Sequence, residues 1–376
     1  MKIAPFRLER YFACYEFSTP YLLSSSDCEA LSLRDLLSLA GDETRLLWEG
    51  LKLGYTESAG LGPLREEVAC LYHGVEPEQV LIVVPEEGIF LAMNAILGAG
   101  DHVICTFPGY QSLYEVATAL GCELTLWRPM EEEGWRFTSQ FLVEAIRPNT
   151  KLVVCNFPHN PTGYLPAKAE WQRIVDACAA RGITLFSDEM YRLLELSPAD
   201  RLPSAVEEYD RAVSLSGMSK VFGMAGVRLG WLVTRDEALL RSMAALKDYT
   251  TICSSAPSEI LSLIALRARE EILRRHRELI ARNLRLLDDL MRQHPRVMTW
   301  VPPQAGTVCF PRLLEGISSA DFCRALIQEA GIMLLPSTVY DYDDQHVRIG
   351  VGRASFPEVL ARFGEYLDHN PQYDTR

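Results

Sequence analysis

Residues 151–188 read KLVVCNFPHNPTGYLPAKAEWQRIVDACAARGITLFSD, and this stretch decides the fold class. Its two ends, Lys151–Asn156 and Thr184–Asp188, are short β-branched or apolar runs that are typical of buried strands. Between them, Pro166–Arg181 carries apolar residues at helical spacing. A strand, a helix and a second strand in this order form the crossover connection of a parallel sheet. The stretch therefore predicts an α/β unit.

The same alternation extends in both directions from this unit. Further strand-like runs bring the total to seven, at Gln79–Val84, His102–Phe107, Glu123–Arg128, Ala212–Ser216 and Leu229–Thr234. Amphipathic stretches of helical period separate most of them, at Glu87–Leu97, Tyr110–Leu120 and Glu237–Asp248. The pattern predicts a large α/β domain with a mostly parallel seven-stranded sheet that is covered by helices.

The last third of the chain differs from this pattern. Residues 255–293 are rich in Leu, Arg and Glu and predict one long helix that bridges two domains. Short strand-like runs and two helical stretches follow, at Arg296–Val301, Thr307–Pro311, Ile332–Leu335, His346–Val351, Ser319–Ala330 and Pro357–Leu367. We expect a smaller α+β domain, with residues 1–50 as the N-terminal segment that joins it, 51–270 as the large domain and 271–376 as its C-terminal part.

Composition and charge exclude several classes of protein. The 376 residues include 37 basic and 50 acidic side chains, and the net charge of −13 disfavours nucleic acid and anionic membrane surfaces as partners. The N-terminus has no apolar signal segment, and the longest apolar stretch, near residues 89–99, is too short to cross a bilayer. The ten cysteines have no CxxC pair or metal-ligand spacing, so we expect no metal site and a cytoplasmic location.

Unusual polar residues follow the ends of the predicted strands, where open parallel sheets bind their ligands. They are Glu86 and Glu87 after the first strand, Tyr110 after the second, Asn160 after the fourth, Asp188 and Tyr191 at the fifth, and Lys220 with Arg228 after the sixth. Each has a structural explanation when taken alone, such as a helix cap for Asp188 or a turn for residues 160–163. Their joint occurrence at strand ends predicts one ligand site at one edge of the sheet.

Four motifs together resemble the class I/II, fold-type I aminotransferases that depend on pyridoxal 5′-phosphate. They are Asn160-Pro161-Thr162-Gly163, Ser187-Asp188-Glu189-Met190-Tyr191, Gly217-Met218-Ser219-Lys220 with Gly226-Val227-Arg228-Leu229-Gly230, and His346-Val347-Arg348-Ile349-Gly350. The resemblance covers nearly the whole chain. It implies that Lys220 binds pyridoxal 5′-phosphate as a Schiff base and carries the substrate's proton, and that Asp188 faces the pyridine nitrogen.

The resemblance also implies how the rest of the site is built. Asn160 and Tyr191 would hydrogen-bond the ring oxygen, with Tyr191 counted among the catalytic residues, and Tyr110 would stack on the ring. The phosphate group would be held by Ser219, Arg228, the amides near Glu86 and Glu87, and Tyr55 of a second subunit, with Ser216 as a further contact. A homodimer follows. Arg348, together with Asn160, would bind the α-carboxylate of the substrate.

Two positions depart from the family pattern. The stretch Pro85-Glu86-Glu87 puts a proline and two carboxylates where the phosphate loop usually has small residues, so both glutamate side chains are expected to point away. Gly217 stands where one family branch has a hydroxyl residue, and Ser216 is expected to compensate. The resemblance further implies a cis peptide bond at Asn160-Pro161.

The predicted reaction transfers an amino group between an α-amino acid and a 2-oxo acid. A C–S β-lyase or a cyclase with the same cofactor remains an alternative. A nicotinamide-dependent oxidoreductase is less favoured because Gly98-Ala99-Gly100 and Gly350-Val351-Gly352 do not complete the dinucleotide motif, and a non-catalytic regulator is disfavoured by the negative charge.

Residues 249–255 lack the arginine of dicarboxylate-specific relatives, so a neutral or apolar substrate side chain is expected. Tyr21, Trp48 and the run Ser24-Ser25-Ser26 are candidates for the pocket lining.

Overall fold

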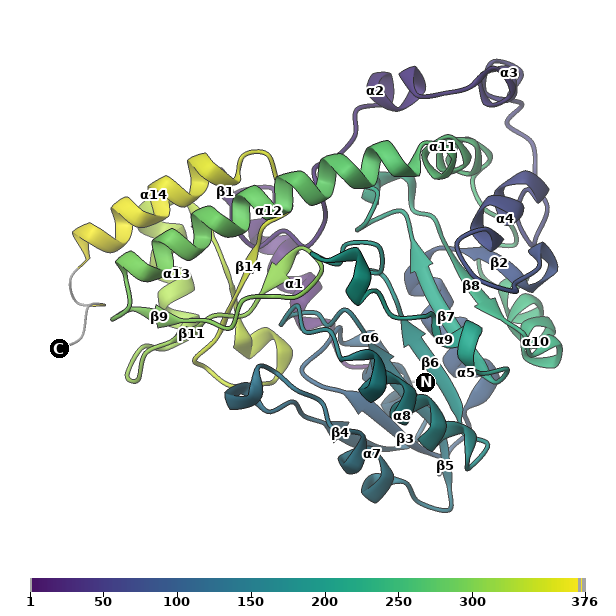
Figure 1. The fold of residues 1–376 in the computed structure, drawn as a ribbon, viewed down its shortest axis with the longest axis horizontal. Coiled ribbons are helices and arrows are strands. Elements are labelled where there is room, and N and C mark those ends of the chain that lie inside the picture. Colours follow the sequence, from purple (N-terminus) through teal and green to yellow (C-terminus); the bar gives the residue numbers. More distant parts are fainter. Residues whose placement is uncertain (1, 371–372, 374–376) are drawn as a thin grey trace.

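A seven-stranded sheet forms the core of the larger part of the computed structural model, which describes residues 2–370 and 373 (Figure 1). Its strands are β2 (Val80–Val83), β3 (His102–Thr106), β4 (Glu123–Trp127), β5 (Thr150–Asn156), β6 (Thr184–Asp188), β7 (Ala212–Gly217) and β8 (Gly230–Thr234). The spatial order is β2-β8-β7-β6-β5-β3-β4. Only β8 runs against its neighbours, β2 and β7. The predicted α/β class and the mostly parallel sheet are confirmed.

Helices cover both faces of this sheet because its strands are apolar on both sides. Apolar residues of one face, such as Val103 and Leu152, pack with those of α5 (Pro85–Ile96), α6 (Ser112–Ala119) and α10 (Glu237–Lys247). Residues of the other face, such as Val153, pack with α7 (Ser139–Ala145) and α8 (Lys168–Ala179). The remaining helices of this part are α4 (Gly62–Ala69) and α9 (Ala205–Glu208), with 3-10 turns η1 (Pro77–Gln79), η2 (Glu131–Glu133), η3 (Pro198–Asp200) and η4 (Ala225–Val227).

The prediction of one helix over residues 255–293 is wrong. Two helices, α11 (Ala256–Arg267) and α12 (Arg269–Gln293), meet at Ala268, whose φ of −95° and ψ of 13° leave the helical region. The two helices bury different surfaces. α11 packs against α4, whereas α12 runs beside α14 (Phe356–His369) (Figure 1). A straight helix cannot reach both surfaces, so the chain bends between them.

Short strands make up the second part of the molecule. They are β9 (Met298–Thr299), β10 (Val308–Cys309), β11 (Arg312–Leu313), β12 (Ile332–Met333), β13 (Leu335–Pro336) and β14 (Val347–Gly350), accompanied by α13 (Ser319–Ala330) and the 3-10 turn η5 (Ser337–Tyr340). The N-terminal segment joins them, because β1 (Tyr21–Leu22) pairs in parallel with β12. The same segment supplies α1 (Arg7–Tyr15), α2 (Leu33–Ser38) and α3 (Asp42–Glu49), and α1 lies against η5.

Residues 23–31, which we call the N-terminal strap, join the two parts through backbone hydrogen bonds. At one end, Leu23 N donates to Met333 O at 3.0 Å, and Gly350 N donates to Leu23 O at 2.8 Å. At the other end, Cys28 N donates to Lys220 O at 3.2 Å. The strap therefore lies across the loop that follows β7. Within the described residues, none of the helices is both long enough and apolar enough to cross a membrane.

Candidate active site

A cavity of about 390 Å³ opens at the carboxyl ends of β5, β6 and β7. The predicted site residues in its lining are Glu86, Tyr110, Asn160, Asp188, Tyr191, Ser219, Lys220, Arg228 and Arg348. Three predicted residues, Glu87, Ser216 and Tyr55, are not part of this lining. The structure thus brings together side chains from widely separated parts of the sequence, at the edge of the sheet where the strand ends predict a ligand.

Lys220 stands in the turn that follows β7. Its Nζ donates a hydrogen bond to Ser26 Oγ at 2.8 Å. Burial lowers the pKa of Lys220, and the charge of Arg348 lowers it further, while the carboxylates of Asp27, Glu9 and Asp188 oppose the shift. A lowered pKa increases the fraction of neutral amine, which is the nucleophilic form.

Close backbone packing explains why glycine precedes this turn. A Cβ atom on Gly217 would lie 2.9 Å from the Cα of Gly230 and 3.0 Å from Cγ of Pro85, so a larger residue does not fit. The neighbouring hydroxyl of Ser216 is buried and donates to Glu189 O at 3.4 Å. Ser216 therefore faces away from the cavity.

Asp188 ends β6 and is buried, with 5% of its surface exposed. Its Oδ1 accepts a hydrogen bond from Met190 N at 3.1 Å, and its carbonyl accepts one from Asn156 Nδ2 at 3.1 Å. Burial raises the pKa of Asp188 to about 7, although the Met190 amide and the charge of Lys220 act in the opposite direction. Among the described cationic side chains, none forms an ion pair with this carboxylate. The cavity therefore presents a buried acid without a counter-ion.

Asn160 is fixed by the strand end beside it. Its backbone N donates to Asn156 Oδ1 at 2.8 Å, and the Asn160-Pro161 peptide bond is cis, as expected. The two tyrosine hydroxyls of the lining also have partners. Tyr191 donates to Ser26 O at 3.0 Å, and Tyr110 donates to Glu9 Oε1 at 3.1 Å.

Arg348 lies on β14 and is buried, with 1% of its surface exposed. Its NH1 donates to Tyr340 Oη at 2.8 Å and to Asn160 Oδ1 at 3.4 Å, and its NH2 donates to Ser24 O at 2.8 Å. The Nε atom has no hydrogen-bond partner within the described part of the chain, and no described carboxylate pairs with the guanidinium. A buried, unpaired guanidinium favours an anionic ligand.

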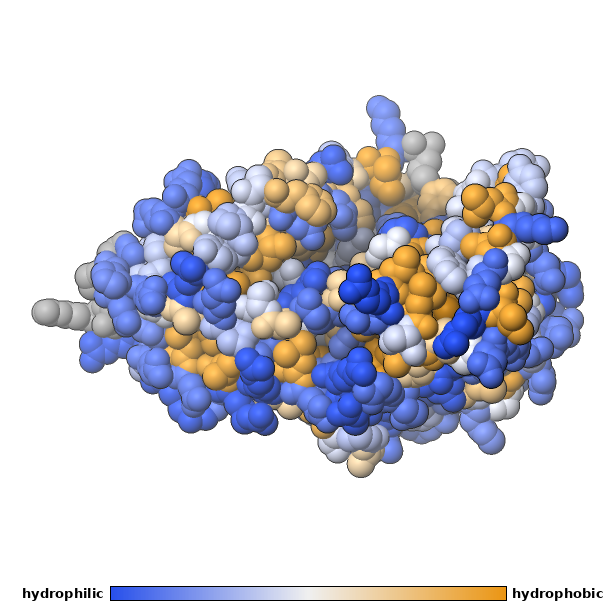
Figure 2. Space-filling view, turned by 90° about the horizontal axis from the view of Figure 1, so that it is seen from above, coloured by the Kyte–Doolittle hydropathy of each residue, from blue (hydrophilic) through white to orange (hydrophobic). Residues whose placement is uncertain are grey.

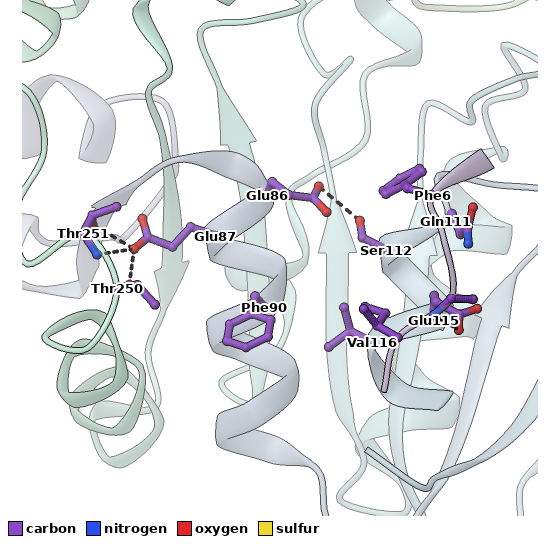
Figure 3. A pocket seen from close by; sticks show the side chains of 12 residues that line it. Phe6, Glu86, Glu87, Phe90, Gln111, Ser112, Glu115, Val116, Thr250 and Thr251 are labelled. Atoms are coloured by element: carbon purple, nitrogen blue, oxygen red, sulfur yellow. Dashed lines mark hydrogen bonds between the residues drawn. The ribbon is translucent and has the colours of Figure 1, made fainter. Parts of the chain in front are cut away.

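The two glutamates at the start of α5 have different partners, as Figure 3 shows in a view of a neighbouring pocket that both of them line. Glu87 turns away from the cavity and accepts hydrogen bonds from Thr250 Oγ1 and from Thr251 N at 3.2 Å. Glu86 lines the cavity, against the expectation that both would point away, and accepts from Ser112 Oγ at 3.2 Å. Burial raises the pKa of Glu86 to about 7, so this side chain is partly neutral near neutral pH and repels an anion less.

Arg228 and Tyr55 are the most exposed of the predicted residues. Arg228 has a left-handed φ of 52° and donates from NH1 to Ala225 O at 3.0 Å. Tyr55 is 92% exposed and lies outside the cavity of its own chain.

The N-terminal residues of the lining were not predicted as site residues, apart from the serine run. They are Leu8, Glu9, Phe12 and Glu16 on or next to α1, and Asp27 in the N-terminal strap. Ser25 and Ser26 line the cavity as the serine run suggests, whereas Tyr21 and Trp48 do not. The spacing of Glu9, Phe12 and Glu16, three and then four residues apart, is the signal that places them on one helix face.

Comparisons with known proteins agree with this site. The family described as "Aminotransferase class I and II" matches residues 22–362. A valine–pyruvate aminotransferase of Mycobacterium tuberculosis is 31% identical over 329 residues, which cover 84% of each chain. Capreomycidine synthase of Streptomyces vinaceus is 27% identical over 361 residues, 93% of this chain and 84% of its own.

A solved structure shares the whole architecture. It is a PLP-dependent aminotransferase from Streptococcus suis, with a TM-score of 0.92, 29% identity and complete coverage of both chains. The family match over most of the chain and this likeness agree with the sequence motifs. The chain therefore belongs to the aminotransferase class I and II family and is a pyridoxal phosphate-dependent aminotransferase.

Proposed function

We propose that the cavity around Lys220 transfers an amino group between an α-amino acid and a 2-oxo acid, with Lys220 as the covalent anchor of pyridoxal 5′-phosphate. One observation carries this proposal. Lys220, the unpaired acid Asp188 and the unpaired guanidinium of Arg348 line a single cavity. Lys220 would bind the aldehyde of the cofactor, Asp188 would face its protonated ring nitrogen, and Arg348 would bind the carboxylate of the substrate.

The residues present fit the cofactor. Asp188 is a buried carboxylate without a protein cation, and a positively charged pyridine nitrogen would supply the missing counter-charge. Asn160 and Tyr191 would hold the ring oxygen, and Tyr110 would cover the ring. The phosphate group would be held by Ser219, Arg228, the backbone amides of Glu86 and Glu87, and Tyr55 of a second copy of the chain, while the predicted contact from Ser216 would require a movement of its hydroxyl. When bound, the cofactor delocalises the electron pair that remains as a bond to the substrate's Cα breaks.

Lys220 would move the proton in this reaction. Its lowered pKa makes the neutral amine available, and a neutral Nζ can accept the proton from Cα and later return it. Ser26 holds this nitrogen 2.8 Å from its Oγ and so limits the positions that Nζ can take. Arg348 would bind the α-carboxylate, since Ser24 O and Tyr340 Oη fix its guanidinium in one orientation.

We further propose that two copies of the chain form a homodimer. Large hydrophobic side chains near Tyr55 are exposed, including Leu53 at 86%, Tyr249 at 91% and Ile252 at 51%. Figure 2 shows several clusters of hydrophobic residues on one face of the molecule among a mostly hydrophilic surface. Exposed apolar groups of this kind mark protein interfaces.

A cytoplasmic location is also proposed. The ten cysteines are free thiols, and six of them are buried: Cys28, Cys105, Cys155, Cys178, Cys309 and Cys323. This usage supports a reducing compartment.

Borohydride reduction of the purified holoenzyme tests the proposed function. We expect mass spectrometry to find a pyridoxyl group on Lys220, and we expect the visible absorption band to be absent in Lys220→Ala. Amino transfer should require a 2-oxo acid acceptor. Pyruvate release without an acceptor would instead indicate a β-lyase, and a cyclic product without an acceptor would indicate a cyclase. An adduct elsewhere on the chain would overturn the assignment of Lys220.

A further inference from the structure

Helix α1 adds carboxylates to the cavity. Glu9 lies within this helix and Glu16 caps its C-terminal end, and both side chains line the cavity together with Phe12. Their spacing of three and four residues places all three on one helix face. The cavity therefore has an acidic wall, opposite in charge to Arg348.

The other charged groups of the lining have partners or roles. Asp27 forms an ion pair with Arg353 at 2.8 Å. Glu9 accepts a hydrogen bond from Tyr110, and Glu86 accepts one from Ser112. Lys220, Arg228, Arg348 and Asp188 are occupied by the cofactor and the substrate carboxylate under the proposed function.

Glu16 has neither a partner nor such a role. Its carboxylate makes no hydrogen bond and no ion pair with the described residues, although the side chain is half-buried. Burial and the like charges of Asp27 and Glu9 raise its pKa, against the opposing charges of Arg353 and Lys220. A cation from outside the chain would relieve this repulsion.

The position of Glu16 is also unfavourable for the helix. It is the C-cap residue of α1, and the last turn of α1 contains no basic residue. A carboxylate at a helix C-terminus opposes the helix dipole, and no described side chain forms an ion pair with Glu16 to offset this cost. Arg348 also lines this cavity and has no carboxylate partner among the described residues, which independently indicates a ligand with an anionic end.

We propose that the amino-acid substrate carries a cation, an ammonium or a guanidinium, at the end of its side chain, and that Glu16 binds this cation. The proposal rests on the proposed function, because it takes the α-carboxylate to be held by Arg348. Phe12 would pack against the aliphatic stem, and Glu9 would add to the negative potential. This substrate class departs from the neutral or apolar side chain that residues 249–255 favour.

Matched amino acids test this proposal in the holoenzyme. L-arginine is compared with L-citrulline, which has nearly the same shape and no charge, and L-lysine is compared with L-norleucine. The measurement is the half-saturation concentration for the change in cofactor absorbance without an oxo acid. We expect the half-saturation concentration of the charged amino acid in each pair to be lower than that of its neutral match by roughly tenfold or more. This is the typical gain from a charge-assisted hydrogen bond. The shift in Tm caused by each amino acid should follow the same order.

Variants separate the role of Glu16 from a general effect. Glu16→Gln should remove the preference for the charged amino acids and leave the neutral ones unchanged, whereas Glu208→Gln, at an exposed position of α9, should change neither. Equal half-saturation for arginine and citrulline in the unaltered protein would overturn the proposal. So would an equal effect of Glu16→Gln on both. If no amino acid changes the absorbance, the proposed function itself fails.

Discussion

Lys220 donates a hydrogen bond from Nζ to Ser26 Oγ at 2.8 Å, although the two residues lie 194 positions apart in the sequence. The carbonyl oxygen of Ser26 also accepts hydrogen bonds from Tyr191 Oη at 3.0 Å and from Thr307 Oγ1 at 2.7 Å. One residue of the N-terminal strap therefore connects the proposed anchor lysine, a proposed ring-binding tyrosine and the C-terminal part of the molecule.

Replacing this serine should affect the reaction rate. In Ser26→Ala, Nζ of Lys220 loses the acceptor that limits its position. We expect a decrease in kcat of about tenfold, which corresponds to roughly 1.4 kcal/mol, the size of one hydrogen bond. Steady-state kinetics with a saturating oxo acid checks this. Ser242→Ala, on the exposed side of α10, is the control, and an unchanged kcat in Ser26→Ala would show that the hydrogen bond has no part in the reaction.

The cofactor-free protein should lose stability as the pH rises. The pKa of Asp188 is about 7 in the folded chain and 3.8 as its ordinary value, so between these values the folded state binds more protons than the unfolded state. The free energy of unfolding must then fall with rising pH across this window. Urea unfolding at pH 5 and pH 8 should show a smaller difference for Asp188→Asn than for the unaltered chain. The same difference in both proteins would contradict the assigned pKa.

Substrate binding should depend on the shape of the arginine side chain. Arg348→Lys keeps the positive charge but loses the planar fork that can bind a carboxylate with two hydrogen bonds. We expect KM for the amino acid to rise roughly 10- to 100-fold, with a smaller effect on kcat, because one charge-assisted hydrogen bond contributes about 1.5–3 kcal/mol.

A second variant tests how this arginine is positioned. Tyr340→Phe removes the hydroxyl that lies 2.8 Å from NH1 of Arg348, and it should raise KM by a smaller factor in the same direction. A rise in KM that is equal for amino acids and for ligands without a carboxylate would argue against carboxylate binding by Arg348.

Mixed dimers should show whether Tyr55 contributes to the active site of its own subunit or to that of the other copy. Tyr55→Ala and Lys220→Ala should each reduce activity in homodimers. Co-expression of the two variants should restore part of the activity, because one site of the mixed dimer would then combine an intact Lys220 with Tyr55 of the other copy. If activity does not return although mass measurements show mixed dimers, Tyr55 does not act across the interface.

Gly350→Ala should destabilise the fold. A Cβ atom at position 350 would lie 1.8 Å from Ser25 O, and glycine is the residue that allows β14 to approach the N-terminal strap so closely. We expect a loss of about 3 kcal/mol in the free energy of unfolding, the upper range for overpacking. Gly62→Ala, whose Cβ would meet no atom within 4 Å, is the control for urea unfolding.

Local sequence patterns predicted the central sheet well. The runs that became β2 to β8 agree with the structure within about two residues, because strands buried on both faces are apolar throughout and are bounded by turn residues. The antiparallel direction of β8 was not predicted, since a short apolar run has the same composition in either direction. The break at Ala268 was missed because Ala is a favourable helix residue, and the bend is imposed by the surfaces that α11 and α12 cover.

The strand-end motifs predicted the residues that line the cavity from the sheet, but not the residues of α1 that line it from the N-terminal segment. Asp188 and Lys220 lie at strand ends, where the topology itself brings residues together. Glu9, Glu16 and Asp27 reach the cavity from the N-terminal segment, and no short-range pattern encodes contacts between such distant parts of the chain. The domain boundaries at residues 50 and 270 and the roles of the site residues stay predictions.

The N-terminal strap has a mechanical consequence. Its carbonyl at Ser24 receives a hydrogen bond from Arg348, and two residues further on the hydroxyl of Ser26 receives one from Lys220. Because Leu23 and Ser24 are both hydrogen-bonded to β14, a rotation of the C-terminal strands over the sheet would carry this end of the strap along and strain the hydrogen bond between Ser26 and Lys220. Closure of the molecule around an amino acid would thus change the position of the Lys220 amine through residues 24–26 alone.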